Sequence, residues 1–397
     1  MEYKKECPCC SSSRIKNFLN LDNVPVNSVL NLKTRDQAIG FPRGDIALGF
    51  CDSCGFIFNI AFDQELLEYS AEYESTQSFS STYSAFARHQ AEELIERHNL
   101  RGRDLLEIGC GNGEFLTLLC ELGGNRGLGF DPAYKQGRIH SSRGIKVKFI
   151  KDFYSEIYSI YRADFIYCRM TLEHIPNAGE FVSMVRRGIG KHPDVIVFFQ
   201  VPDVTRIIQN CAFEDIYYEH CSYYSPGSLA RLFRNCGFQV LNIETGYDGQ
   251  YVMIDARPPN GGPPAILLEE DDLSRIKSLI ETFPGKLQKM LFEWRKRIDN
   301  FSTRGLRVVV WGSGSKGVTF LTTLGINNEV DYVVDINPHR QDCYMVGTGQ
   351  RIISPDFLKE YQPDVVIAMN AIYRDEIQKD LNKMDLDPLV LALGENI

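Results

Sequence analysis

A buried strand that runs into a glycine-spaced turn and then into a helix occurs twice, and this pattern limits the possible folds more than any other feature. The first copy reads "DLLEIGCGNGEF" over residues 104–115, and the second reads "VVVWGSGSKGVTF" over residues 308–320. Glycine lets the backbone turn sharply and approach a ligand closely. A strand, a glycine turn and a helix together open a nucleotide-binding α/β domain. The sequence therefore predicts an α/β protein with two Rossmann-like domains.

The first glycine loop carries the features of an S-adenosylmethionine site. Its E-x-G-x-G-x-G spacing begins at Glu107. The glycines that follow are Gly109, Gly111 and Gly113. Dinucleotides place a pyrophosphate on such a loop, whereas S-adenosylmethionine has no phosphate and offers an amino-acid end and a ribose. Asp131, in "GLGFDP", ends the next strand, where a carboxylate can bind both ribose hydroxyls, and Asp152, in "FIKDFYS", follows a third strand near the expected adenine. These features in this order predict that the domain binds S-adenosylmethionine.

Four cysteines near the N-terminus form two CxxC pairs, Cys7 with Cys10 and Cys51 with Cys54. Four thiolates at this spacing are typical of a closed tetrahedral zinc site. Such a site leaves no open position for water, so we predict a structural zinc. The chain has twelve cysteines and no secretory signal, which indicates thiols or metal in a reducing compartment, and we expect a cytoplasmic protein.

Changes in sequence texture divide the 397 residues into three parts. The cysteine pairs lie in an irregular N-terminal segment. Helical and strand patterns then alternate as far as "RPPNGGPP" at residues 257–264, which can be neither a helix nor a central strand. An amphipathic helical stretch follows and leads into the second glycine loop. We expect a zinc-binding domain over 1–66, the S-adenosylmethionine domain over 67–260 and the second Rossmann-like domain over 261–397.

The second glycine loop matches the dinucleotide fingerprint G-x-G-x-x-G, and Asp335 follows it in "YVVDINP", about twenty residues on. One interpretation is a redox domain that binds NAD. Another is that Lys316 and the start of the following helix bind the diphosphate of a nucleotide-linked substrate. A third is a domain that binds no nucleotide. The residues alone leave these three interpretations open.

Charge and hydropathy exclude two classes of partner. The net charge is -9 and no basic arm offsets it, which argues against nucleic-acid binding. No apolar run is long enough to cross a membrane. We therefore expect a small-molecule substrate, and an anionic one would need a local basic pocket.

Several motifs together resemble the sugar C-methyltransferases that act on nucleotide-linked keto sugars in deoxysugar pathways. The motifs that carry the resemblance, in family order after the cysteine pairs, are "LLEIGCGNG", "MTLEHIPN", "YYEHCSYYS", "WGSGSKGVTFL" and "VVDINPHR". The resemblance covers essentially the whole chain. It implies a zinc-binding domain, a class I methyltransferase domain and a C-terminal Rossmann-like domain that helps to bind the nucleotide sugar and contributes Lys316.

The resemblance also implies roles for the block "YYEHCSYYS" and for two residues outside it. Methylation of carbon needs a base that removes a proton next to a ketone and donors that stabilise the enolate oxygen. His220 would be the base, while Glu219 and Tyr217 would position the base and the sugar. His174, in "LEHIP", would line the same cavity and polarise the keto oxygen, and Tyr73 would close over the site.

The chain departs from the family pattern at a few positions. Tyr218 stands where the family usually has histidine, and "VGTGQRI" at residues 346–352 replaces a "PGTxIPI" segment. The sequence therefore leaves open which sugar, which carbon and which nucleotide are involved, and also the oligomeric state. Two alternative functions remain: a sugar O- or N-methyltransferase, and an NAD-dependent oxidoreductase that uses the C-terminal glycine loop.

Overall fold

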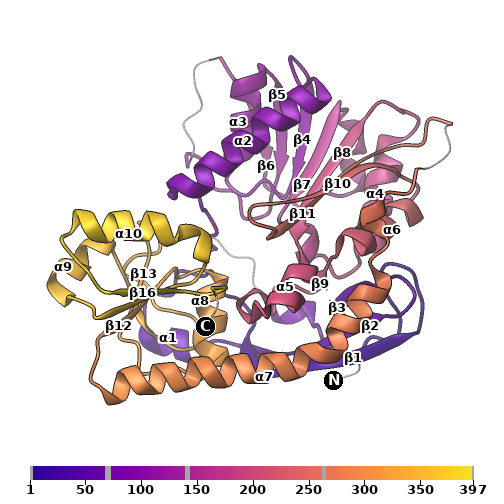
Figure 1. Ribbon diagram of the computed structural model, residues 1–397. Helices are drawn as coiled ribbons and strands as arrows, with labels where there is room; N and C mark the ends of the chain where they lie inside the picture. The colour runs from indigo at the N-terminus through magenta and orange to yellow at the C-terminus, as the bar shows by residue number, and fades with distance from the viewer. Residues whose placement is uncertain (1–2, 68–72, 139–143, 262–264, 396–397) are drawn as a thin grey trace.

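The N-terminal segment forms an antiparallel sheet that takes its last strand from a distant part of the chain. The computed structural model describes residues 3–67, 73–138, 144–261 and 265–395 (Figure 1). The sheet order is β1-β2-β3-β9. The strands are β1 (Ile15–Pro25), β2 (Arg43–Cys51), β3 (Ile57–Asn59) and β9 (Ser222–Tyr223). A short helix, α1 (Arg35–Ile39), lies between β1 and β2. Because β9 lies beyond residue 66, the predicted N-terminal domain does not complete its own sheet.

The central domain is a seven-stranded sheet in the order β10-β11-β8-β7-β4-β5-β6. Its strands are β4 (Asp104–Ile108), β5 (Arg126–Phe130), β6 (Lys146–Ile150), β7 (Phe165–Arg169), β8 (Ile196–Pro202), β10 (Gln239–Gly246) and β11 (Tyr251–Arg257). Neighbouring strands from β6 to β8 pair in parallel, and β11 runs antiparallel between β8 and β10. This order confirms the predicted class I methyltransferase sheet.

Helices cover both faces of the central sheet. They are α2 (Ser81–His98), α3 (Glu114–Gly123), α4 (Ala178–Ile189) and α6 (Pro226–Asn235). The short helix α5 (Val204–Asn210) instead packs with the N-terminal sheet and the long helix Leu273–Thr303. Leu105 packs with α2 and α3, whereas Leu106 and Ile108 pack with α4 and α6. Figure 1 shows these helices beside the sheet. Successive side chains of a strand point to opposite faces, and residues 105–108 are all buried, so "LLEI" forms a strand buried on both sides.

The C-terminal domain is a five-stranded parallel sheet in the order β14-β13-β12-β15-β16. Its strands are β12 (Val308–Trp311), β13 (Tyr332–Val334), β14 (Arg351–Ile353), β15 (Val365–Ala368) and β16 (Leu389–Ala392). Its helices are α8 (Ser315–Thr323), α9 (Leu358–Tyr361) and α10 (Arg374–Lys383). This sheet confirms the second predicted Rossmann-like unit.

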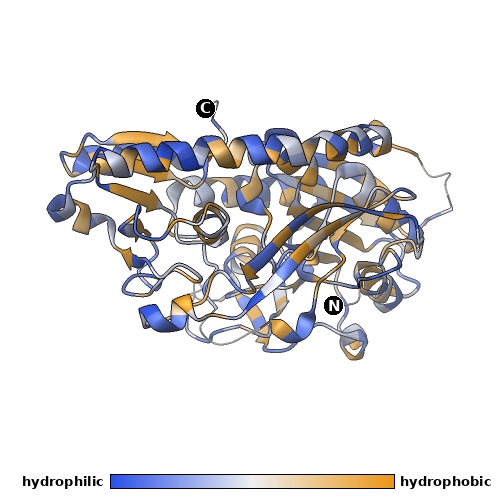
Figure 2. Cartoon of the chain, turned by 90° about the horizontal axis from the view of Figure 1, so that it is seen from below, coloured by the Kyte–Doolittle hydropathy of each residue, from blue (hydrophilic) through white to orange (hydrophobic). Residues whose placement is uncertain are grey.

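A long helix, α7 (Leu273–Thr303), joins the three parts of the molecule. It runs along one side of the protein, past β1 and on to the C-terminal domain (Figure 1), and polar and apolar residues alternate along it (Figure 2). Phe283 meets Phe18 of β1 with ring centroids 6.4 Å apart, and Trp294 meets Phe320 of α8 at 5.3 Å. Among the helices that the structure describes, none, α7 included, has an apolar stretch suited to crossing a bilayer.

Short 3₁₀ turns complete the described part of the chain. They are η1 (Gln64–Leu66), η2 (Glu156–Ile160), η3 (Leu172–His174), η4 (Phe213–Asp215), η5 (Leu268–Glu270), η6 (Pro355–Phe357) and η7 (Ala371–Tyr373). The turn η3 follows β7 directly, and η4 precedes the Tyr217–His220 block. The carboxyl ends of strands in both α/β domains face one shared cavity, as the lining residues show.

Candidate active site

A cavity of about 930 Å³ lies between the two α/β domains. Segments that follow β4, β5, β6 and β7 line one part of it, and segments that follow β12, β13 and β15 line another. Its volume lies near the upper end of the usual range for small-molecule sites, about 300–1,000 Å³. The cavity therefore has room for a cofactor and a substrate together. Of the predicted cofactor, catalytic and substrate residues, Gly113 and Glu219 do not line it.

Two of the three glycines in the first loop are required by packing. Gly109 has a φ of +73°, and a Cβ there would lie 2.0 Å from Thr171 Oγ1. Gly113 caps α3 with a φ of +91°, and a Cβ would lie 2.2 Å from the ring of Phe149. Gly111 also has a positive φ, +55°, but its missing Cβ points into open space. The loop can therefore expose its backbone to a ligand at Gly111.

Acidic residues border this loop on the cavity side. Asp131, after β5, accepts hydrogen bonds from the backbone of Gly111 at 2.8 Å and of Ala133 at 2.7 Å. Each carboxylate oxygen has a further lone pair, which leaves room for ribose hydroxyls. Asp152 also lines the cavity and accepts a bond from the Tyr158 hydroxyl at 2.5 Å. The residues present fit the ribose end of S-adenosylmethionine.

Glu107 is buried at the end of β4 and accepts a hydrogen bond from the Tyr167 hydroxyl at 3.2 Å. Burial raises the pKa of Glu107 to about 8, although the charge of Arg169 opposes the rise. Arg169 itself lies with its guanidinium 3.6 Å from the centroid of the Phe115 ring, and it lines the cavity. Sequence analysis missed Arg169, although a charged residue at the end of the apolar strand "DFIYCR" was a usable signal.

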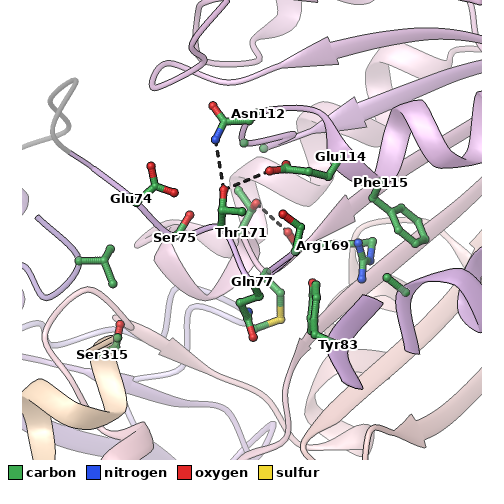
Figure 3. Close-up of a pocket in the computed structure, with 18 of the residues that line it drawn as sticks. Glu74, Ser75, Gln77, Tyr83, Asn112, Glu114, Phe115, Arg169, Thr171 and Ser315 are labelled. Carbon is green, nitrogen blue, oxygen red and sulfur yellow. Dashed lines mark hydrogen bonds between the residues drawn. The ribbon is translucent and has the colours of Figure 1, made fainter. Parts of the chain in front are cut away.

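The segment before α2 lies over the glycine loop (Figure 3). Asn112 Nδ2 donates to Thr76 Oγ1 at 3.3 Å, and Thr76 Oγ1 donates to Glu114 Oε1 at 3.1 Å. Tyr73 begins the segment and lines the cavity, and its carbonyl accepts a bond from Lys135 Nζ at 3.2 Å. Tyr83 also lines the cavity, while Tyr69 falls outside the described residues. The predicted closing segment therefore borders the cofactor loop.

His174 is held in one tautomer by the backbone. Its Nδ1 lies 2.9 Å from the carbonyl oxygen of Glu219. A carbonyl can only accept, so Nδ1 carries the hydrogen and Nε2 keeps its lone pair. Burial lowers the pKa of His174 to about 4, which keeps the ring neutral at pH 7. A neutral His174 in this tautomer has no second N–H with which to polarise a keto oxygen.

His220 and Tyr217 form a hydrogen-bonded pair in the wall of the cavity. The Tyr217 hydroxyl lies 2.6 Å from His220 Nε2, and the rings of His220 and His174 are 5.0 Å apart between centroids. Burial, followed by the proximity of His174 and Lys316, lowers the pKa of His220 well below its usual value. His220 is therefore a neutral imidazole that can accept a proton.

Glu219 bonds away from the cavity. Its carboxylate accepts hydrogen bonds from Ser28 Oγ and, at 3.4 Å, from Asn27 Nδ2, both from the N-terminal segment. Ser28 Oγ lies 2.7 Å from Ser315 Oγ, at the start of α8. Burial raises the pKa of Glu219 to about 7. Through Ser28, Glu219 links the central domain to the N-terminal segment and to the C-terminal domain. The sequence motif did not indicate this link.

Glu173 is a buried carboxyl group that sequence analysis did not single out. It lines the cavity, it is only 1% exposed, and neither carboxyl oxygen has a hydrogen-bond partner among the described residues. One side-chain oxygen of Glu173 and one ring nitrogen each of His174 and His220 lie within 4.8 Å of one another. In the sequence, Glu173 is simply the neighbour of the predicted site residue His174. Its distinguishing feature is a buried carboxyl group without a hydrogen-bond partner among the described residues, which only the structure shows.

Asp335, the acid that follows β13, is hydrogen-bonded to the second glycine loop. Asp335 accepts hydrogen bonds from the backbone of Ser313 at 3.0 Å, from the Ser313 hydroxyl and from the backbone of Asn337 at 2.8 Å. Arg340 Nε donates to the same Ser313 hydroxyl at 2.9 Å. Three donors already bind Asp335 and leave one lone pair, on Oδ1, for a ribose hydroxyl. No contact here favours NAD over the other two interpretations.

Lys316 lines the cavity and forms an ion pair with Asp215 of η4. Arg206 Nη1 contacts the other carboxylate oxygen of Asp215 at 3.1 Å. The Lys316 side chain remains 23% exposed. Its ammonium is therefore positioned by the central domain, and its side chain remains partly exposed.

The four predicted zinc cysteines come together away from the cavity. One sulfur each of Cys7, Cys10, Cys51 and Cys54 lies within 4.8 Å of the others. The Cys7–Cys54 and Cys10–Cys51 sulfur pairs are both 3.6 Å apart. Zinc–sulfur bonds of about 2.3 Å in a tetrahedron give sulfur separations of roughly 3.8 Å, so this donor set fits zinc.

Comparison with known proteins agrees with this arrangement. Residues 82–243 match a family model described as a methyltransferase domain, and residues 265–387 match one described as a C-methyltransferase C-terminal domain. The C-methyltransferase NovU of Streptomyces niveus is 24% identical over 387 residues, which cover 94% of this chain and 91% of that protein.

The solved structures that are similar to this chain share little sequence with it and cover less than half of it. A 1,6-didemethyltoxoflavin-N1-methyltransferase from Burkholderia thailandensis is 17% identical, with 46% of this chain and 84% of that chain covered and a TM-score of 0.33. The magnesium protoporphyrin IX methyltransferase of Synechocystis PCC 6803 is 14% identical, with 45% and 84% covered and a TM-score of 0.35. The order of the seven strands establishes the fold of the central domain. From the two domains and their order, the chain is an S-adenosylmethionine-dependent methyltransferase that carries a C-methyltransferase C-terminal domain.

Proposed function

We propose that this enzyme methylates the carbon next to the ketone of a nucleotide-linked deoxy keto sugar. The observation that carries the proposal is the neutral, hydrogen-bonded pair of Tyr217 and His220 in a cavity that the S-adenosylmethionine loop and the C-terminal glycine loop both line. A carbon–hydrogen bond next to a ketone needs a base of this kind, because the carbon must lose its proton before it can attack a methyl group.

The cofactor would lie over the first glycine loop. We propose that Asp131 binds the ribose hydroxyls, that Asp152 faces the adenine and that Gly111 offers its backbone to the amino-acid end, with Glu107 beneath it. Arg169 would add positive charge for the cofactor carboxylate, because one of its nitrogens has no partner among the described residues. Gly109 and Gly113 would shape the loop. When bound, S-adenosylmethionine supplies an electrophilic methyl group.

The sugar nucleotide would extend toward the C-terminal domain. We propose that Lys316 attracts its diphosphate, since this ammonium lines the cavity and remains partly exposed. Arg340 lines the same wall and would add a second, buried positive charge. The basic pocket that an acidic protein needs for an anionic substrate would therefore be built from this loop.

His220 would take the proton from the sugar carbon. Tyr217, 2.6 Å away, would orient the imidazole and share its hydrogen bond as the ring becomes charged. Tyr73 would close the cavity from the side of the glycine loop. Glu219 would act from behind, by holding the Tyr217–His220 block against Ser28.

The remaining assignments concern the scaffold. We propose that Cys7, Cys10, Cys51 and Cys54 bind a structural zinc, because their sulfurs already approach tetrahedral spacing. We also propose functional boundaries near residues 66 and 260, with zinc binding before the first, methyl-donor binding between them and substrate binding after the second. The N-terminal unit would depend on β9 for its last strand.

The test is hydrogen exchange without methyl transfer. Wild-type enzyme, S-adenosylhomocysteine and a panel of nucleotide-linked keto sugars are incubated in deuterated water, and mass spectrometry follows deuterium at the sugar carbon. We expect exchange with wild type and a loss of about 10²–10⁴-fold in His220→Ala. His89→Ala, on the exposed face of α2, is the matched control. Methylation without exchange into carbon in the wild type would favour an O- or N-methyltransferase and refute the proposal.

Lys316 provides a second test on the substrate side. Lys316→Ala should raise the KM for the sugar nucleotide and leave the affinity for S-adenosylhomocysteine unchanged. Lys289→Ala, on the exposed face of α7, is the control. An unchanged KM in Lys316→Ala, combined with tight NADH binding by the wild type, would support the oxidoreductase alternative instead.

A further inference from the structure

The proposed reaction needs a hydrogen-bond donor for the oxygen of the ketone, close to His220. An enolate forms readily in a protein only if a hydrogen-bond donor stabilises the charge that develops on its oxygen. Neutral His174 gives its N–H to the carbonyl of Glu219, and the Tyr217 hydroxyl is paired with His220. Glu219 is bonded to Ser28 and Asn27. Within this block, two groups have no hydrogen-bond partner among the described residues: Nδ1 of His220, the proposed base, and the carboxyl group of Glu173.

Glu173 is held in place by its backbone while its side chain stays free. It lies in η3, and its carbonyl oxygen accepts a weak bond from Cys221 Sγ at 3.6 Å. Its carboxyl group lies within 4.8 Å of a ring nitrogen of both His174 and His220 and lines the cavity. A substrate atom that reaches His220 in this cavity therefore also comes near Glu173.

Burial favours the protonated form of this group. A carboxylate removed from water without a partner is costly, so the acid keeps its proton. Burial raises the pKa of Glu173 to about 8, and no neighbouring cation opposes the shift. The titratable groups around it are His174 and His220 at the cavity and Cys168, Tyr217, Cys221 and Tyr224 in the wall, all of which are uncharged in their ordinary buried forms.

We propose that Glu173 is a catalytic acid that transfers its proton to the ketone oxygen as His220 removes the proton from the neighbouring carbon. This inference rests on the proposed function. The carbon–hydrogen bond breaks toward His220, its electron pair forms the carbon–carbon double bond, and the carbonyl π electrons take the proton of Glu173. The products are an enol, a carboxylate at Glu173 and an imidazolium at His220. These two opposite charges lie close together and stabilise each other.

The second step restores the acid. The enol carbon attacks the methyl carbon of S-adenosylmethionine, and the carbon–sulfur bond breaks with its electron pair on sulfur. The enol proton returns to Glu173 as the carbonyl re-forms. His220 keeps the proton from carbon and releases it to solvent, so the overall reaction yields methylated ketone, S-adenosylhomocysteine and one proton. No oxidant or metal is needed for this balance.

The experiment compares two conservative variants, Glu173→Asp and Glu173→Gln, in the exchange assay. Gln keeps the size and shape of Glu but cannot give up a proton, whereas Asp keeps the acid and shortens the side chain. If Glu173 donates a proton, Glu173→Gln should lose about 10²–10⁴-fold in exchange rate. Glu173→Asp should then retain more activity than Glu173→Gln. A packing role predicts the reverse order. Glu180→Gln, on the exposed surface of α4, is the control.

Binding and KM separate this role from a general loss of structure. Both variants should bind S-adenosylhomocysteine within about twofold of wild type, and the loss should fall on kcat and not on KM. If wild type exchanges and Glu173→Gln exchanges at the same rate, or if Gln outperforms Asp, the acid role is refuted and the proposed function stands. If the wild-type enzyme catalyses exchange in none of the keto sugars, the proposed function is refuted, and this inference is refuted with it.

Discussion

Replacing Gly109 with alanine should destabilise the methyltransferase domain much more than the same change two residues later at Gly111. Both residues have a positive φ, +73° and +55°, and a non-glycine residue there costs about 1–2 kcal/mol. At Gly109 the new Cβ would also lie 2.0, 2.7 and 2.8 Å from three atoms of Thr171. Relief of such overpacking costs about 1–3 kcal/mol more. At Gly111 no atom lies within 4 Å of the new Cβ.

The difference is measurable as a melting temperature. One kcal/mol shifts the midpoint of a domain of 150–250 residues by about 2–4 °C, so Gly109→Ala should melt on the order of 2–12 °C below Gly111→Ala. Differential scanning calorimetry of the cofactor-free protein resolves the domains. The order should be reversed for cofactor affinity. The methyl group of Gly111→Ala would lie in open space at the cavity, so this variant should bind S-adenosylhomocysteine more weakly with little loss of stability.

A double mutant tests the stated cause. Thr171→Ala removes the two atoms that a Cβ at position 109 would meet at 2.0 and 2.7 Å. In the Gly109→Ala background it should therefore recover part of the lost melting temperature, whereas in the wild-type background it should recover none. Equal midpoints for Gly109→Ala and Gly111→Ala, or no recovery in the double mutant, would refute the reasoning.

Three further predictions concern cofactor, metal and pH. Asp131→Ala should weaken S-adenosylhomocysteine binding about tenfold or more, because a charge-assisted hydrogen bond contributes roughly 1.5–3 kcal/mol; calorimetry that finds wild-type affinity would contradict this. Cys51→Ser should lose zinc by elemental analysis and lower the melting temperature, whereas Cys236→Ser, outside the cluster, should do neither. Glu107 and Glu173 have folded pKa values of about 8, above the usual 4.5, so the folded protein holds protons that the unfolded chain releases. Stability of the cofactor-free protein should fall as pH rises from about 5 to 8, and a melting temperature that rises over this range would contradict the assignment.

The parts of the site that follow strand ends could be predicted from the sequence. In a parallel sheet the carboxyl ends of the strands meet at one edge, so Asp131 after β5 and His174 after β7 come together through the topology alone. The glycine loops could be located because only glycine tolerates their backbone angles and close contacts. Local pattern and sheet order were enough for these residues.

The rest depends on packing between distant segments. Glu219 looked like a cavity residue because it precedes His220, yet its carboxylate bonds to Ser28, 191 residues away in the chain. The Lys316–Asp215 pair and the short strand β9 likewise join distant segments. Glu173 could not be distinguished from an ordinary loop acid, because its importance comes from being buried without a partner. Burial of a loop side chain is a property of the assembled domains.

The sharing of β9 has a consequence for how the protein is made. A ribosome releases the N-terminus first, so β1, β2 and β3 emerge well over a hundred residues before the strand that completes their sheet at Ser222–Tyr223. During that interval the free edge of β3 is open to pairing with another nascent chain. The four cysteines, however, are all available once Cys54 has left the exit tunnel. The proposed zinc would bind these cysteines before β9 is made, and it would hold β1, β2 and β3 together in the meantime.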